Sequence, residues 1–114
     1  MIRIEGQWNL EAWRRVRGDG AVSYPFGEKA TGMLVYTASG GMIVQMTAAE
    51  RQPLDTNDPI GGTVEERAKA YSGYLAYFGR YEVKGNEVHH FIDGCLYPNW
   101  IGDEQVRPFE LSGD

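Results

Sequence analysis

Short runs in which apolar and polar side chains alternate recur along the chain, and glycines separate them. In residues 7–16, Trp8, Leu10 and Ala12 alternate with polar neighbours, which is the two-residue period of a strand with one buried face. A Gly-Asp-Gly turn at residues 18–20 precedes a shorter apolar run around residues 21–24. The pattern predicts a first strand over 7–16 and a brief one over 21–24.

Two pairs of β-forming runs predict hairpins. Residues 31–37 and 41–47 flank an Ala-Ser-Gly loop, and residues 80–84 and 87–92 flank Gly85-Asn86. Both connections are short and contain the glycine that a tight turn needs. A further strand over 104–111 follows a turn at Pro98-Asn99. We expect Gln105, Arg107, Phe109 and Leu111 on one face of that strand, with Phe109 and Leu111 choosing the inner side.

A single helix is predicted over about residues 63–79. Thr63 and Glu66 have the spacing of a capping box, and Gly79 is able to end the helix. Both faces of the 31–47 hairpin are apolar, so we expect this helix to cover one of them. Residues 48–62, which lack periodicity, are expected to form a long loop or lid. The apolar stripe of the helix consists of Val64, Ala68, Tyr71, Leu75 and Phe78.

Length and composition indicate one domain, residues 1–114, with a single core. A net charge of -5 excludes a surface built to follow nucleic-acid phosphates. The lone Cys95 forms no intrachain disulfide and belongs to no thiol zinc site, which favours a reducing, cytoplasmic setting. No apolar run approaches the ~18 residues of a membrane span, and no phosphate-loop pattern is present. We therefore expect no membrane partner, cofactor or metal.

Several groups of residues, in order over nearly the whole chain, carry a family resemblance. They are Gly6-Gln7-Trp8, Tyr24-Pro25-Phe26-Gly27, Thr31-Gly32 before Tyr36, Gly73-Tyr74 with Tyr77-Phe78-Gly79-Arg80-Tyr81, His89-His90, and Pro98-Asn99-Trp100 with Gln105-Val106-Arg107. Together they resemble the lipocalin-like domain family of bacteria and fungi. The resemblance implies a mainly β fold, a small antiparallel barrel of calycin type with one helix. It also implies a family of ill-defined function, without an agreed catalytic residue.

Two further expectations come from the resemblance. Barrels of the wider lipocalin kind cover a tryptophan of the first strand with an arginine of the last, so Trp8 and Arg107 are expected to form a structural cation-aromatic contact. The alternative for Arg107 is to bind an anionic ligand. Family members look as though they continue past Ser112-Gly113-Asp114 into another strand, so this barrel is expected to lack its last strand. An unpaired edge of that kind favours a homodimer.

His89 and His90 are adjacent in a predicted strand, so their side chains point to opposite faces and do not chelate one metal. One of them is expected to face the interior and the other solvent or the helix, and the sequence leaves open which. The inner one is interpreted first as a hydrogen-bonded core histidine. The alternative is a catalytic base that shuttles protons beside Tyr36 or Tyr81, and for that role His90 is favoured because Val88 and Ile92 share its side.

A few polar groups that converge among aromatic rings are typical of a small-molecule site. Tyr71, Tyr74 and Phe78 are interpreted as ordinary helix packing, and Cys95 as a small buried hydrophobe. Asn99 and Trp100 have the alternative of merely holding a turn. The candidate ligand-binding residues are Tyr36, Gln45, Tyr81, His90, Asn99, Trp100 and Gln105.

The sequence favours a binding module that holds a small, largely apolar or aromatic molecule in a barrel cavity. Two alternatives stay open. One is a cofactor-independent isomerase or cyclase that moves a proton through His90 or a tyrosine. The other is a dimerising interaction protein with a filled barrel. The absence of cofactor motifs permits the enzyme without favouring it, so binding ranks first.

Overall fold

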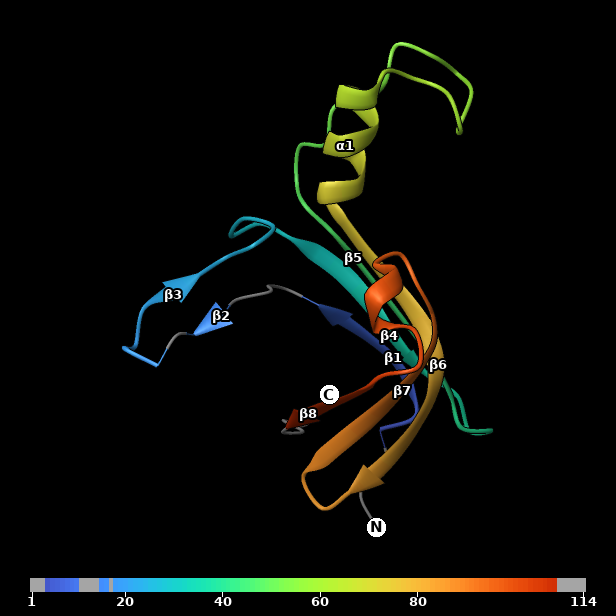
Figure 1. Ribbon diagram of the computed structural model, residues 1–114. Coiled ribbons are helices and arrows are strands. Elements are labelled where there is room, and N and C mark those ends of the chain that lie inside the picture. Colours follow the sequence, from blue (N-terminus) through green and yellow to red (C-terminus); the bar gives the residue numbers. More distant parts are fainter. Residues whose placement is uncertain (1–3, 11–14, 17, 109–114) are drawn as a thin grey trace.

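The main body is a six-stranded antiparallel sheet that curves strongly (Figure 1). The computed structural model describes residues 4–10, 15–16 and 18–108. The strands of this sheet lie in the order β1 (Gly6–Leu10), β4 (Thr31–Tyr36), β5 (Gly41–Thr47), β6 (Tyr74–Lys84), β7 (Glu87–Cys95) and β8 (Glu104–Pro108). The remaining elements are β2 (Arg15–Val16), β3 (Val22–Ser23), the helix α1 (Val64–Ser72) and the 3-10 helix η1 (Pro98–Trp100).

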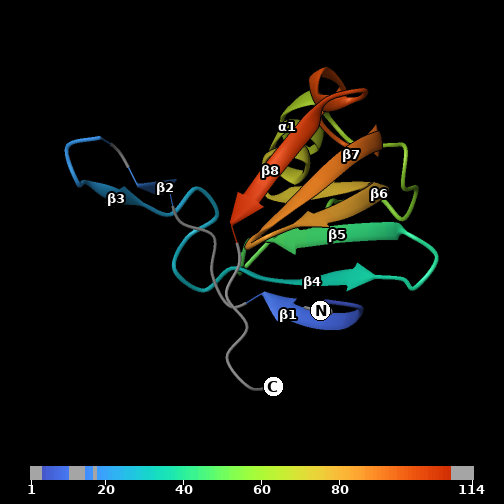
Figure 2. The ribbon, with the colours of Figure 1, turned by 90° about the horizontal axis from the view of Figure 1, so that it is seen from below.

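The sheet is open at its two edges. Within the described residues β1 pairs with β4 alone and β8 pairs with β7 alone, so no hydrogen-bonded ladder joins the first strand to the last. Figure 2 shows the strands as a fan, with β1 and β8 at opposite sides. The prediction of a mainly β, antiparallel fold with one helix is confirmed. The strands that the structure describes do not close into a barrel.

Both predicted hairpins are confirmed. β4 and β5 pair from Thr31 with Thr47 to Tyr36 with Met42. β6 and β7 meet at a turn in which Gly85 has a φ of 63°, a conformation that glycine adopts without strain.

The helix is shorter than predicted, because it begins at Val64 and ends at Ser72 instead of Gly79. The capping box is present: the Thr63 side chain accepts from the Glu66 amide and the Glu66 carboxylate accepts from the Thr63 amide. Gly73 caps the end. From Tyr74 the chain pairs with β5, because the same apolar residues also alternate with period two and the sheet satisfies their backbone groups.

The predicted strand over 7–16 is wrong as one element. β1 ends at Leu10, and Arg15–Val16 pair instead with Val22–Ser23 in a separate small sheet that projects from the main body (Figure 2). Locally, Asp19 accepts a hydrogen bond from the Ala21 amide within the turn between these two short strands. Arg15–Val16 therefore have Val22–Ser23, a few residues further along the chain, as their pairing partner. The predicted short strand over 21–24 is confirmed as β3.

The core lies on one face of the sheet. Seven buried residues cluster there, contributed mainly by alternate positions of β4, β5, β6 and β7: Ile4, Tyr36, Met42, Val44, Tyr77, Val88 and Ile92. The opposite face is uncovered, and Ile43 and Phe78 are 45% and 56% exposed on it. The expectation that the helix covers this face is wrong, because α1 lies beyond the end of the sheet (Figure 1) and has no buried residue.

The remaining predictions have mixed outcomes. Residues 48–62 contain no helix or strand, as expected. The turn at Pro98-Asn99 is the 3-10 helix η1. β8 confirms the start of the last strand, whereas Phe109 and Leu111 lie outside the described residues. Among the described residues, none of the helices has the length and apolar character needed to cross a membrane.

A close backbone approach at Gly79 gives a first test of the fold. The pairing of β6 with β7 shifts register between Phe78 and Gly79, and a Cβ on Gly79 would lie 1.9 Å from the Phe91 carbonyl oxygen. Gly79→Ala is therefore expected to lower the free energy of unfolding by at least about 2 kcal/mol, measured by urea denaturation. Gly18→Ala is the control, because nothing lies within 4 Å of its Cβ position. Equal stability of the two variants would contradict the described register.

Candidate functional site

Two tyrosines hold a buried histidine on the inner face of the sheet. Tyr36 of β4 and Tyr77 of β6 are each 4% exposed, and His90 of β7 is 2% exposed. The Tyr36 hydroxyl lies 2.6 Å from His90 Nε2, and the Tyr77 hydroxyl lies 2.9 Å from His90 Nδ1. We call these three side chains the tyrosine-histidine relay. Three strands, of which β6 and β7 are neighbours and β4 is separated from β6 by β5, therefore position one continuous hydrogen-bonded unit.

Aromatic rings flank the relay on both sides. The Tyr81 ring centroid lies 4.7 Å from that of Tyr36, and the Tyr81 hydroxyl donates to the Thr37 carbonyl. Trp100 of η1 meets the Tyr77 ring edge-on at 6.1 Å. The polar atoms of the relay are thus set in an apolar, aromatic surrounding. This is the composition by which proteins orient small aromatic molecules.

Burial keeps the relay uncharged at neutral pH. It lowers the pKa of His90 from 6.5 to about 4, and the positive charge of Arg107 acts in the same direction. Burial also raises the pKa of Tyr36. The pKa of Tyr77 is raised for the same reason, although the charge and hydrogen bonding of Arg107 partly offset this effect. The neutral imidazole therefore has one donor nitrogen and one acceptor nitrogen.

Strand β8 adds two of the predicted residues to the inner face. Gln105 lies opposite His90 and Arg107 lies opposite Val88 in the β7 to β8 pairing, so both share the side of the relay. Gln105 is half-buried, whereas Arg107 is exposed. The Arg107 charge nevertheless acts on every member of the relay.

The expected contact between Trp8 and Arg107 is not formed within the part of the chain that the structure describes. There, arginines lie over the rings of Tyr74 and Phe91, from Arg51 and Arg80. Trp8 packs beside the core and donates its indole N–H to the Ile4 carbonyl at 2.8 Å. The positive charge of Arg107 acts instead on the Tyr77 hydroxyl.

Of the predicted binding residues, Tyr36, Tyr81, His90, Trp100 and Gln105 gather on or beside the inner face. Gln45 does not. It lies on the opposite face, where its side-chain oxygen accepts from the Tyr74 hydroxyl at 2.6 Å. Asn99 is exposed on η1. Gln45 lies on the outer face because side chains alternate along β5 and its neighbours Val44 and Met46 occupy the core side.

The prediction for the histidine pair agrees with the structure. The two side chains point to opposite faces: His90 faces the interior, and His89 faces outward against the Glu104 carboxylate. The residue that sequence reasoning missed is Tyr77. Tyr77 was missed because its segment was predicted to be helical. The two-residue period through Leu75 and Tyr77 would have placed Tyr77 on the inner face.

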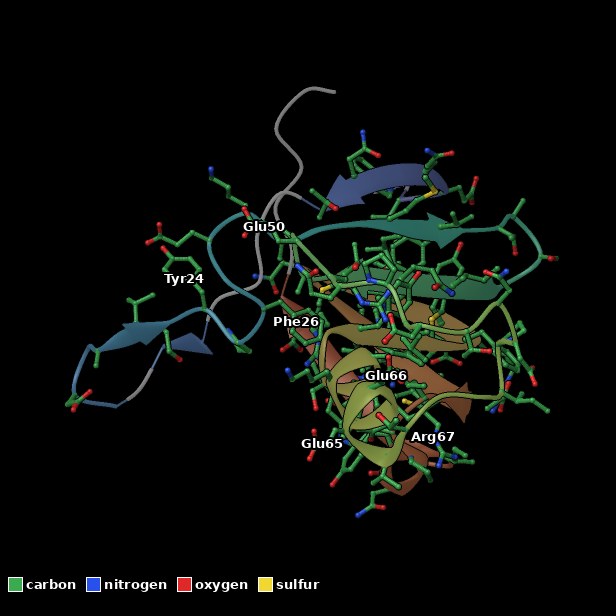
Figure 3. All side chains as sticks on the ribbon, turned by 90° about the horizontal axis from the view of Figure 1, so that it is seen from above. Tyr24, Phe26, Glu50, Glu65, Glu66 and Arg67 are labelled. Atoms are coloured by element: carbon green, nitrogen blue, oxygen red, sulfur yellow. The ribbon has the colours of Figure 1, made fainter. Side chains whose placement is uncertain are left out.

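An apolar pocket of about 190 Å³ lies next to the relay at the α1 end of the sheet. Phe26, Leu75, Tyr97 and Trp100 are among its lining residues, and Trp100 links it to Tyr77. Figure 3 shows Phe26 at the edge of the main body, whereas Tyr24 lies on the projecting segment. The pocket offers aromatic contact surface, and the relay beyond Trp100 offers polar atoms.

A second, more polar cavity of about 470 Å³ lies between residues 48–55 and α1. A separate cavity of about 410 Å³ is lined by residues 56–59 together with Leu54, Arg67 and Ala70. Two contacts fix this loop to the helix. The Glu66 carboxylate accepts from the Asp55 amide at 3.0 Å, and Arg51 donates to the Ala70 carbonyl at 2.9 Å. Glu65 and Arg67 are exposed on α1 (Figure 3), and Arg67 donates to the Thr63 carbonyl at 3.5 Å. No cluster of three metal-binding side chains occurs among the residues described.

A small, mainly β protein whose antiparallel sheet curves round a buried polar cluster is the class that the fold and site define. The chain belongs to the lipocalin-like domain family, whose model matches residues 5–114. It is 40% identical over 63 residues to the 4'-hydroxy-3'-methoxypropiophenone carrier protein of Aspergillus oryzae. That match covers 48% of this chain and 57% of the fungal protein, so the chain spans little more than half the length of its relative. No solved structure gives a significant match.

The lowered pKa of His90 predicts a pH dependence of stability. The unfolded chain binds a proton at the histidine near pH 6.5, whereas the folded protein resists protonation until about pH 4. Between these values the unfolded state holds more protons, so the free energy of unfolding falls as the pH falls. The contribution of His90 is on the order of 2–3 kcal/mol and is fully present above pH 6.5. His90→Gln is expected to flatten this slope in urea titrations between pH 7 and pH 4.

His89→Gln provides the matched control for this measurement. His89 lies on the outer face and is only half-buried, so its replacement should leave the slope attributed to His90 in place. If the wild-type protein and the His90→Gln variant lost stability in parallel over this pH range, the buried, neutral state of His90 would be refuted.

Proposed function

We propose that the protein binds and carries a small aromatic molecule that has a polar oxygen, with the inner face of the curved sheet as its binding surface. The observation that carries this proposal is the tyrosine-histidine relay. Its three side chains are buried, uncharged and surrounded by aromatic rings. A polar cluster of this kind costs free energy in a core unless its hydrogen bonds are satisfied, so its presence favours a role in recognition.

The comparisons support the same class of ligand. The fungal relative is named as a carrier of an aromatic ketone with hydroxyl and methoxy substituents. A ring of that size suits a surface built from tyrosine and tryptophan, and its oxygens suit hydroxyl and imidazole partners. The proposed ligand for this chain is accordingly a substituted phenyl compound, held in a barrel-like cavity that the curved sheet partly encloses.

Catalysis is the less favoured alternative. A histidine whose pKa is lowered to about 4 has a weak affinity for protons at neutral pH, so His90 is poorly matched to the task of a general base. The raised pKa values of Tyr36 and Tyr77 keep their hydroxyls protonated as well. These side chains are suited to donating and accepting hydrogen bonds without transferring protons.

A dimerising interaction protein is also less favoured. The open edge strand β8 has charged residues at Glu104 and Arg107 and ends at Pro108, which has no amide hydrogen to donate. Charges and proline at a sheet edge are features that oppose pairing with another chain. The open edge by itself therefore supports a dimer only weakly.

A calorimetric titration with 4'-hydroxy-3'-methoxypropiophenone tests the proposed function. We expect saturable binding of one molecule per chain, with a dissociation constant of roughly micromolar order. Trp100→Leu should weaken binding by about tenfold or more, because it removes an aromatic wall beside the relay. The absence of saturable heat with the wild-type protein would reject this ligand class.

Phe78→Leu is the matched control, because it also replaces an aromatic ring by leucine but on the uncovered outer face, where Phe78 is 56% exposed. Its affinity should stay within about twofold of the wild type. Circular dichroism verifies that both variants are folded. Loss of binding in Phe78→Leu together with normal binding in Trp100→Leu would place the ligand on the wrong face for this proposal.

A further inference from the structure

The relay contains more hydrogen-bond donors than it uses. With a neutral imidazole, the three side chains have three polar hydrogens, two on the tyrosine hydroxyls and one on the ring. Only two contacts join them, one at each nitrogen of His90. One hydroxyl hydrogen therefore has no acceptor within the relay, whichever nitrogen carries the ring proton. A buried donor without an acceptor costs about 1–3 kcal/mol.

The two ends of the relay differ in their surroundings. At one end, Arg107 lies on the side of the sheet that carries the relay, and its positive charge acts on the Tyr77 hydroxyl. A cation attracts the oxygen of a hydroxyl and repels its hydrogen, so the Tyr77 hydrogen is directed away from Arg107. At the other end, the hydroxyl of Tyr36 has His90 as its hydrogen-bond partner among the residues that the structure describes.

This asymmetry gives the relay a direction. A hydroxyl whose oxygen faces a cation becomes a stronger donor, because the charge polarises it. Tyr77 is then the better donor to His90 Nδ1, and the ring hydrogen belongs on Nε2, from which it is donated to the Tyr36 oxygen. In the reverse direction His90 would donate to Tyr77, and the Tyr77 hydrogen would lose His90 as its acceptor while lying near the positive charge of Arg107.

We propose that the relay selects ligands with a carbonyl oxygen: Tyr77 donates to His90, His90 donates to Tyr36, and the remaining hydrogen of Tyr36 donates to the ligand. This deepens the proposed function and rests on it. The ligand class is then a neutral aromatic ketone or aldehyde, because a carbonyl oxygen has no hydrogen of its own and is a stronger acceptor than the ether oxygen of a methoxy group. Such an oxygen satisfies the buried donor for which the described residues of the relay have no acceptor.

The tautomer of His90 tests the direction of the relay without any ligand. In long-range hydrogen-nitrogen NMR spectra of the nitrogen-15-labelled wild-type protein at pH 7, we expect His90 to carry its hydrogen on Nε2. A spectrum of His89→Gln identifies which signals belong to His90. A hydrogen on Nδ1, or a doubly protonated ring at this pH, would overturn the proposed direction.

A matched pair of ligands tests the selection by Tyr36. The probes are 4'-hydroxy-3'-methoxypropiophenone and 2-methoxy-4-propylphenol, which has a methylene group in place of the carbonyl. The wild-type protein is expected to bind the ketone about tenfold more tightly, the value of one hydrogen bond. In Tyr36→Phe this preference should fall to about one, while the affinity for the propylphenol stays within about twofold.

Tyr24→Phe is the control for this comparison. It also removes a tyrosine hydroxyl, but Tyr24 lies on the projecting segment (Figure 3), so the preference for the ketone should persist. If the wild-type protein bound both probes equally, or if Tyr36→Phe kept the tenfold preference, selection by Tyr36 would be overturned although the proposed function survived. Failure of both probes to bind the wild-type protein would reject the proposed function and this selection together. The NMR result would then still decide the direction of the relay.

Discussion

The structure depends on the burial of His90 between Tyr36 and Tyr77. A histidine that is 2% exposed is tolerated in an apolar core when it is neutral and both ring nitrogens are hydrogen-bonded. Each tyrosine comes from a different strand, so the requirement fixes the relative register of β4, β6 and β7. The same contacts that stabilise the inner face therefore also gather the polar atoms of the candidate site.

Local pattern predicted the elements whose partners are close in sequence. The hairpins and the capping box at Thr63 follow from turn chemistry and alternation. Where two periods competed, the pattern was ambiguous: residues after Gly73 fit a helical stripe and a strand equally, and pairing with β5 decided for the strand. The formation of a strand after Gly73 depends on pairing with β5, about thirty residues earlier in the sequence. A pattern read over a short stretch of sequence does not contain that partner.

The candidate site was predicted in part for the same reason. Alternation predicted that Gln105 and Arg107 share a face of the last strand, whereas Tyr36, Tyr81 and His90 were candidates because of their residue types. Gln45 was also a candidate but lies on the outer face, because pairing within the sheet sets the face on which each β5 residue lies. Tyr77 was missed with the helix boundary. The position of Arg107 beside Tyr77 could not be read from sequence, since it requires β8 to lie in a particular register against β7.

The inner face of the sheet, and not the exposed outer face, is proposed to receive an aromatic ligand. Intermolecular nuclear Overhauser effects in a complex with 4'-hydroxy-3'-methoxypropiophenone measure this most directly. Contacts are expected between the ligand ring and the ring protons of Tyr36, Tyr77 and Trp100. Contacts confined to Ile43 and Phe78 on the outer face would contradict it.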